Sequence, residues 1–104
     1  MTECSCRYHQ ILNTIQSLSQ KEKKNLYQKT LKLQEELGEF AEAILIHEDA
    51  SGSLYKSKKS NALQEELVDI LLVTLDLFFT IEPQQDQLEA LLQKKSMKWK
   101  EHQK

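Results

Sequence analysis

Two short stretches of the chain repeat one another, and each has the residue pattern of an α-helix. The segment 33–39, LQEELGE, returns at 63–69 as LQEELVD, with the acidic residues in register. Successive helical residues turn by about 100°, so positions i and i+3 share one face. Glu36 therefore pairs with Glu39, and Glu66 pairs with Asp69. Two such helices lying side by side would bring four carboxylates together.

Apolar residues at spacings of three and four predict four helices. The first helix is expected from about Arg7 to Ser19. Ser19 and Glu22 have the spacing of a capping box, which places the start of a long second helix at Ser19 and its end near His47. The third helix is expected from Ser60 or Asn61 to Thr80, and the fourth helix from Pro83 to about Trp99.

A basic loop is expected between the second and third helices. Turn-forming residues around Ser51 and Gly52 precede Lys56, Lys58 and Lys59. Solvated surface is the simpler interpretation of such a loop. Because the loop joins the two acidic stretches, the alternative is that it reaches an anion held by them.

The third helix is apolar on nearly every side, which predicts that more than one neighbour covers it. A chain of 104 residues has few other helices to do so, and we therefore expect a second subunit to share the task. The charges of this helix form one strip, made by Glu65, Glu66, Asp69 and Asp76. Because unpaired buried carboxylates are strongly disfavoured, this strip needs a positively charged partner.

Length and composition indicate a single all-α domain over residues 1–104, with two long central helices and shorter flanking helices, assembling into an oligomeric helical bundle. The formal net charge of -2 predicts no general affinity for nucleic acid or for an anionic membrane. The longest apolar run, Ile70 to Val73, is too short to span a bilayer. A signal-peptide pattern is also missing from the N-terminus, so a cytoplasmic protein is expected.

Cys4, Cys6 and His9 raise the question of a soft metal site near the N-terminus. A closed zinc site normally needs four ligands, and the chain has no second Cys or Cys-His pair. Two reduced thiols on a fraying end are the simpler interpretation.

The four carboxylates of the repeated stretches predict a site for a hard divalent cation. Clustered carboxylates repel one another unless a cation compensates them, and all-oxygen ligation favours Mg²⁺, with Mn²⁺ as a substitute. Di-iron bundles need Glu-x-x-His pairs, which neither His47 nor His102 completes. The competing interpretation is that these are ordinary surface glutamates, but two matching copies, one on an apolar helix, favour the metal site.

The acidic residues also have a family pattern. Glu36-Leu37-Gly38-Glu39, a spacer of about two dozen residues and Glu66-Leu67-Val68-Asp69 resemble the signature of the MazG-like all-α nucleoside triphosphate pyrophosphohydrolases. Glu35 and the phrase from Gly38 to Ile44 are also typical of that family. The resemblance covers about Leu31 to Phe78.

The resemblance implies hydrolysis of a nucleoside triphosphate, a deoxynucleotide or non-standard nucleotide, to the monophosphate and pyrophosphate, in removal of unwanted nucleotides. It also implies a homo-oligomer, expected as a tetramer built from two dimers. Mg²⁺ would bind Glu36, Glu39, Glu66 and Asp69, and Glu35 would orient or deprotonate the attacking water. The phosphates would contact the lysines of the fourth helix, Lys94, Lys95 and Lys98, although the asparagine usual there is missing.

Other roles remain open at this point. Tyr8, Tyr27 or Trp99 could stack on a base, although core packing is the simpler role for each. Gly38 lacks a side chain and would permit close approach of another helix, at a cost of about 1 kcal/mol in helix propensity. The alternative functions are a non-enzymatic helical interaction module whose acids bind a basic partner, and hydrolysis of phosphoribosyl-ATP by a related fold.

Overall fold

The computed structural model describes residues 3–47 and 62–103, and all regular structure within them is α-helical. The helices in chain order are α1 (Glu3–Lys21), α2 (Leu26–His47), α3 (Ala62–Ile81) and α4 (Gln85–His102). The all-α prediction is confirmed, and α2 and α3 are the two longest helices. The predicted basic loop with Lys56, Lys58 and Lys59 lies outside the described residues.

The predicted capping box at Ser19 and Glu22 is wrong. Ser19 lies inside α1, and its hydroxyl donates to the backbone carbonyl of Asp76 on α3, at 3.0 Å, and to the carboxylate of the same residue. The helix start is capped instead by Asn25 and Gln28, whose side chains each accept a backbone N–H of the other at 2.9 Å. Glu22 accepts backbone N–H groups within the connection between α1 and α2.

The other boundaries shift by smaller amounts. The first helix begins at Glu3 instead of Arg7, so the positions of Cys4 and Cys6 belong to α1. Pro83 does not occupy the first turn of α4, because the residue before that helix is Gln84, with an extended backbone. His9 on α1 lies against α4, with its Nδ1 3.0 Å from Nε2 of Gln85 and 3.6 Å from a carboxylate oxygen of Glu89.

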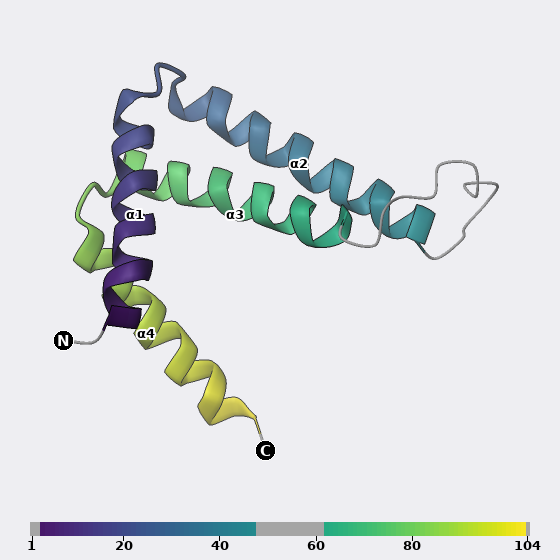
Figure 1. Ribbon diagram of the computed structural model, residues 1–104. Helices are drawn as coiled ribbons and strands as arrows, with labels where there is room; N and C mark the ends of the chain where they lie inside the picture. Colours follow the sequence, from purple (N-terminus) through teal and green to yellow (C-terminus); the bar gives the residue numbers. More distant parts are fainter. Residues whose placement is uncertain (1–2, 48–61, 104) are drawn as a thin grey trace.

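The helices make two arms (Figure 1). Along one arm, α2 and α3 lie side by side, and α1 crosses the C-terminal end of α3. The second arm is α4, which contacts α1 through its first turns and then points away from α2. Every residue of α4 from Glu89 onward is exposed. None of the described helices combines the length and the apolar character that crossing a membrane requires.

The apolar core lies where α1, α3 and the start of α4 meet. Its buried side chains are Leu75, Phe79 and Leu88, and Leu12 and Ile15 of α1 pack against them. Outside this junction, large apolar side chains remain exposed along the helices. On α3 they include Leu67, Val68, Leu71 and Leu72, and on α2 they include Leu31, Leu37 and Leu45.

The described helices do not close into one compact bundle. The residues of α4 from Glu89 onward are exposed, and large apolar side chains of α2 and α3 have no cover among the described residues.

Candidate metal centre

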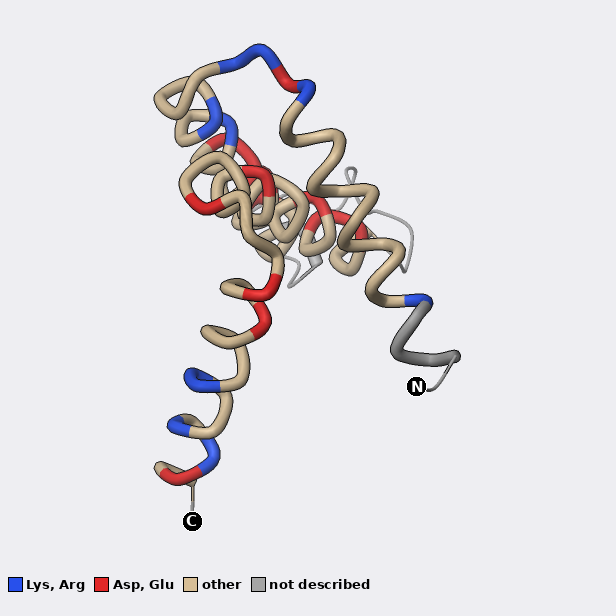
Figure 2. Tube along the Cα trace, turned by 90° about the vertical axis from the view of Figure 1, so that its left-hand side faces the viewer, with Lys and Arg blue, Asp and Glu red and all other residues tan. Residues whose placement is uncertain are grey.

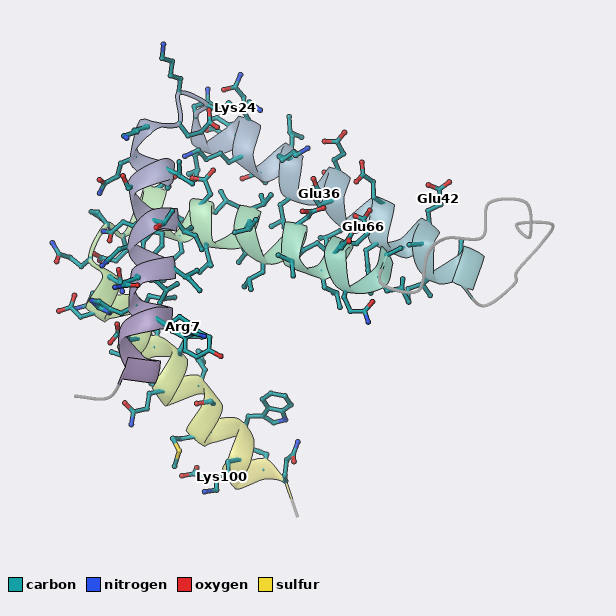
Figure 3. All side chains as sticks on the ribbon, in the orientation of Figure 1. Arg7, Lys24, Glu36, Glu42, Glu66 and Lys100 are labelled. Carbon is teal, nitrogen blue, oxygen red and sulfur yellow. The ribbon has the colours of Figure 1, made fainter. Side chains whose placement is uncertain are left out.

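Three of the four predicted metal-binding carboxylates come together at the α2–α3 contact. Glu36 and Glu39 come from α2 and Glu66 from α3, and one oxygen of each lies within 4.8 Å of the other two. Figure 3 shows Glu36 and Glu66 facing one another across the two helices. We refer to Glu36, Glu39 and Glu66 as the glutamate cluster.

The environment of the glutamate cluster ranges from buried to exposed. Glu36 is 7% exposed, Glu66 is half-buried and Glu39 is exposed. Oε1 of Glu36 and Oε1 of Glu66 are both buried, and neither has a hydrogen-bond partner among the described residues. A buried carboxylate oxygen that loses its water without gaining a donor is costly. Two such oxygens in one cluster are what a site for a cation would provide.

Lys32 compensates part of the negative charge. Its Nζ lies 3.1 Å from Oε2 of Glu36, one helical turn later, and 3.3 Å from Oε1 of Glu35. The hydrogen bond to Glu36 is the largest cause that raises the pKa of Lys32, followed by the hydrogen bond to Glu35. The ammonium binds the other oxygen of Glu36, and Oε1 is left without a partner.

The repulsion between the carboxylates of the cluster acts on Glu39, whose pKa is raised above the ordinary glutamate value. The charge of Glu36 is the largest cause that raises the pKa of the Glu39 carboxyl, and desolvation and then the charges of Glu66 and Glu35 raise it further. Lys32 acts in the opposite direction. Proton binding and cation binding are alternative ways to relieve this repulsion.

Asp69 does not join the cluster. It is exposed and lines an open hollow on α3 together with Gln64, Glu65 and Val68. The two sequence pairs therefore behave differently, because Glu36 and Glu39 act together whereas Glu66 and Asp69 are divided. Glu35, the predicted catalytic residue, is exposed beside the cluster and forms its ion pair with Lys32.

The predicted phosphate-binding lysines lie on the other arm. Lys94, Lys95 and Lys98 are exposed on α4, which leads away from α2 and the glutamate cluster. Figure 3 places Lys100, near the end of this helix, far from Glu36 and Glu66. Within one chain the structure does not bring these lysines to the carboxylates.

The aromatic residues predicted as core or as base platforms are not core residues of the single chain. Tyr8 and Trp99 are each 68% exposed, and Tyr27 is 81% exposed. The expectation that they fill the core is wrong for the isolated chain, because α4 extends past the others and the faces of α1 and α2 that carry the tyrosines point to solvent.

Sequence reasoning missed three lysines near the site. Lys29 is 4% exposed, and its ammonium donates to Asp76 at 2.9 Å and to Thr80 at 2.7 Å. Lys24 and Lys32 line the same two hollows near the start of α2, and Figure 2 shows basic residues in blue around the connection between α1 and α2. The signal for Lys32 was present in the sequence, since it stands four residues before Glu36.

The donor set fits a hard divalent cation. The cluster offers only carboxylate oxygens, and two of them are buried without a partner. Such oxygens suit Mg²⁺, which keeps several waters and takes only a few protein ligands.

Comparison of the chain with protein-family models, with curated proteins and with solved structures gives no match.

Proposed function

We propose that this chain is a Mg²⁺-dependent nucleoside triphosphate pyrophosphohydrolase of the MazG-like kind. The observation that carries the proposal is the glutamate cluster, with unpartnered buried oxygens on Glu36 and Glu66. The sequence pattern around these residues supplies the step from a cation site to a triphosphate substrate.

In this proposal Glu36, Glu39 and Glu66 hold the cation, and Asp69 is the remaining carboxylate of the pattern. When bound, Mg²⁺ supplies the positive charge that stabilises the leaving pyrophosphate. Glu35 is exposed at the edge of the cluster, so its carboxylate is accessible to orient a water molecule and accept its proton. Lys32 holds Glu36 and Glu35 on one side of α2, which keeps both carboxylates beside Glu39.

The proposal includes a homo-oligomer. The exposed apolar side chains of α2 and α3, among them Leu67 and Leu71, support association of several copies.

The test is release of pyrophosphate from a panel of nucleoside triphosphates and phosphoribosyl-ATP, with and without Mg²⁺. Hydrolysis is expected only with Mg²⁺ and is expected to fall by at least a hundredfold in Glu66→Gln, because that variant removes one charged oxygen donor from the cluster. Asp69→Asn reports whether the fourth carboxylate takes part. Glu101→Gln is the matched control, since Glu101 is an exposed glutamate at the end of α4.

Two outcomes would contradict the proposal. Unchanged hydrolysis in Glu66→Gln would remove the cluster from the reaction. A purified protein that releases no pyrophosphate from any substrate and binds neither Mg²⁺ nor Mn²⁺ in calorimetry would favour the interaction module with a basic partner.

A further inference from the structure

A pocket lined by lysines lies next to the glutamate cluster. Its volume is about 220 Å³, far more than one water molecule needs. Lys24 comes from the connection between α1 and α2, whereas Lys29 and Lys32 come from α2. The remaining lining residues are the acids Glu22 and Asp76 and the apolar Leu72 and Val73. We refer to this cavity as the lysine pocket.

The two acids of the lysine pocket are already engaged within the fold. Asp76 accepts the ammonium of Lys29 at 2.9 Å and the hydroxyl of Ser19. Glu22 accepts the backbone N–H of Lys23 at 2.9 Å and of Lys24 at 3.3 Å. Asp76 is therefore paired with the ammonium of Lys29, whereas the carboxylate of Glu22 is hydrogen-bonded to backbone N–H groups and keeps its negative charge.

Lys24 and Lys32 are the two lysines of the lining that are not paired with its own carboxylates. Within residues 3–47 and 62–103, the ammonium of Lys24 has no carboxylate partner, and that of Lys32 is held by Glu35 and Glu36. Both lysines also line a more open hollow together with Gln28, Leu31 and Glu35, the last of which is paired with Lys32. They consequently stand at one entrance, beside the carboxylates.

Lys32 connects the pocket with the cluster. Its Nζ contacts Oε2 of Glu36, the most buried ligand candidate of the cluster. A divalent cation on Glu36 would neutralise the charge that attracts this ammonium. Lys32 would then be able to turn its ammonium from Glu36 to an anion in the lysine pocket.

We infer that the lysine pocket binds phosphate groups of the substrate through Lys24 and Lys32, and that a divalent cation at the glutamate cluster strengthens this binding. The inference rests on the proposed function for the identity of the substrate as a triphosphate. It assigns phosphate binding to α2 and its entrance, where the ammonium groups adjoin the cluster, instead of to the exposed lysines of α4.

The experiment measures binding without turnover, by titrating magnesium pyrophosphate into the protein at a fixed excess of Mg²⁺ in a calorimeter. Lys24→Ala and Lys32→Ala are each expected to weaken this binding about tenfold or more, because each removes a charge-assisted hydrogen bond to phosphate. Lys23→Ala is the matched control, since Lys23 is an exposed lysine of the same connection that does not line the pocket. Circular dichroism checks that each variant remains helical.

A second measurement separates a role in phosphate binding from a structural role. Mn²⁺ binding in the absence of pyrophosphate is expected to be unchanged in Lys24→Ala. It is expected to be equal or tighter in Lys32→Ala, because the ammonium no longer competes with the cation for Glu36. A variant that is merely misfolded would lose both ligands. Wild-type protein in EDTA is expected to bind pyrophosphate at least tenfold more weakly than with Mg²⁺.

Unchanged magnesium pyrophosphate binding in Lys24→Ala would overturn the inference. Loss of binding in Lys95→Ala with none in Lys24→Ala would also overturn it and place the phosphate site on α4. Failure of the proposed function is distinguishable, because a protein that hydrolyses no nucleotide but binds magnesium pyrophosphate through Lys24 keeps the pocket and loses the reaction. Normal hydrolysis with an unchanged KM in Lys24→Ala would keep the proposed reaction and overturn the assignment of phosphate binding to the lysine pocket.

Discussion

The ammonium of Lys29 on α2 lies 2.9 Å from the carboxylate of Asp76 on α3, in a position where only 4% of the lysine side chain is exposed. Ser19 of α1 donates to the same carboxylate, so Asp76 joins three helices. The partner that the acidic strip of α3 requires is thus present for Asp76 within the same chain.

Replacing Asp76 by Ala is expected to lower the free energy of unfolding by about 3 kcal/mol, because the variant leaves the buried ammonium of Lys29 unpaired. The double variant Lys29→Met with Asp76→Leu is expected to lose less, since no isolated charge remains. Urea unfolding followed by circular dichroism measures both changes. Surface substitutions usually change the free energy of unfolding by less than about 0.5 kcal/mol. A change no larger than this in Asp76→Ala would contradict the role assigned to this pair.

The raised pKa of Glu39 predicts a pH dependence of stability in the metal-free protein. Because the folded-state pKa lies above the ordinary glutamate value, the contribution to stability is fully present below that value and is lost as the pH rises through the raised pKa. Glu36 is the largest cause, so Glu36→Gln is expected to lower the pKa of Glu39. A carboxyl-detected NMR titration measures the pKa directly.

Thermal melts across the same pH range supply a second readout. In Glu39→Gln the melting temperature is expected to fall less as the pH rises from acid, because the variant has no carboxyl group to ionise at this position. Saturating Mg²⁺ is expected to raise the melting temperature above that pKa, because a cation binds the charged carboxylates of the folded state. An ordinary pKa for Glu39 in the metal-free protein would show that the three carboxylates are not close in solution.

Gly38 lies in the middle of α2 and has open space around it. A methyl group added there would meet nothing within 4 Å among the described residues, so the close helix approach expected from the sequence does not occur within this part of the chain. Gly38→Ala is expected to raise the free energy of unfolding by about 1 kcal/mol through helix propensity and a less flexible unfolded chain. Urea unfolding tests this, and a loss of stability instead would indicate that another copy approaches α2 at Gly38.

The exposed apolar face of α3 predicts self-association. Leu71 is 54% exposed, and Leu71→Glu is expected to shift the sedimenting species from an oligomer to a monomer, because a charge cannot be buried there without a partner. Gln93→Glu on exposed α4 is the control for added charge. A wild-type chain that sediments as a stable, cooperatively unfolding monomer would be inconsistent with this prediction.

Much of the local structure follows from spacing. Period-3.6 apolar patterns predicted four helices, and the i, i+3 spacing placed Glu36 and Glu39 on one face of α2, because both properties depend only on helical geometry. Helix starts depend on more than spacing. Ser19 with Glu22 predicted the start of α2, but the hydroxyl of Ser19 bonds to Asp76, more than fifty residues away, and Asn25 with Gln28 caps α2 instead.

The sequence by itself determined the helical class of this protein, the acidic pairs and the apolar character of the third helix on nearly every side. Only the tertiary structure decided which carboxylates meet, because the rotation of α3 against α2 brings Glu66 to Glu36 and leaves Asp69 outside. It also separated the lysines of α4 from the cluster and placed those of α2 beside it. Helical periodicity fixes the face of each residue on its own helix, whereas the faces that meet are selected by packing and by buried pairs such as Lys29 with Asp76.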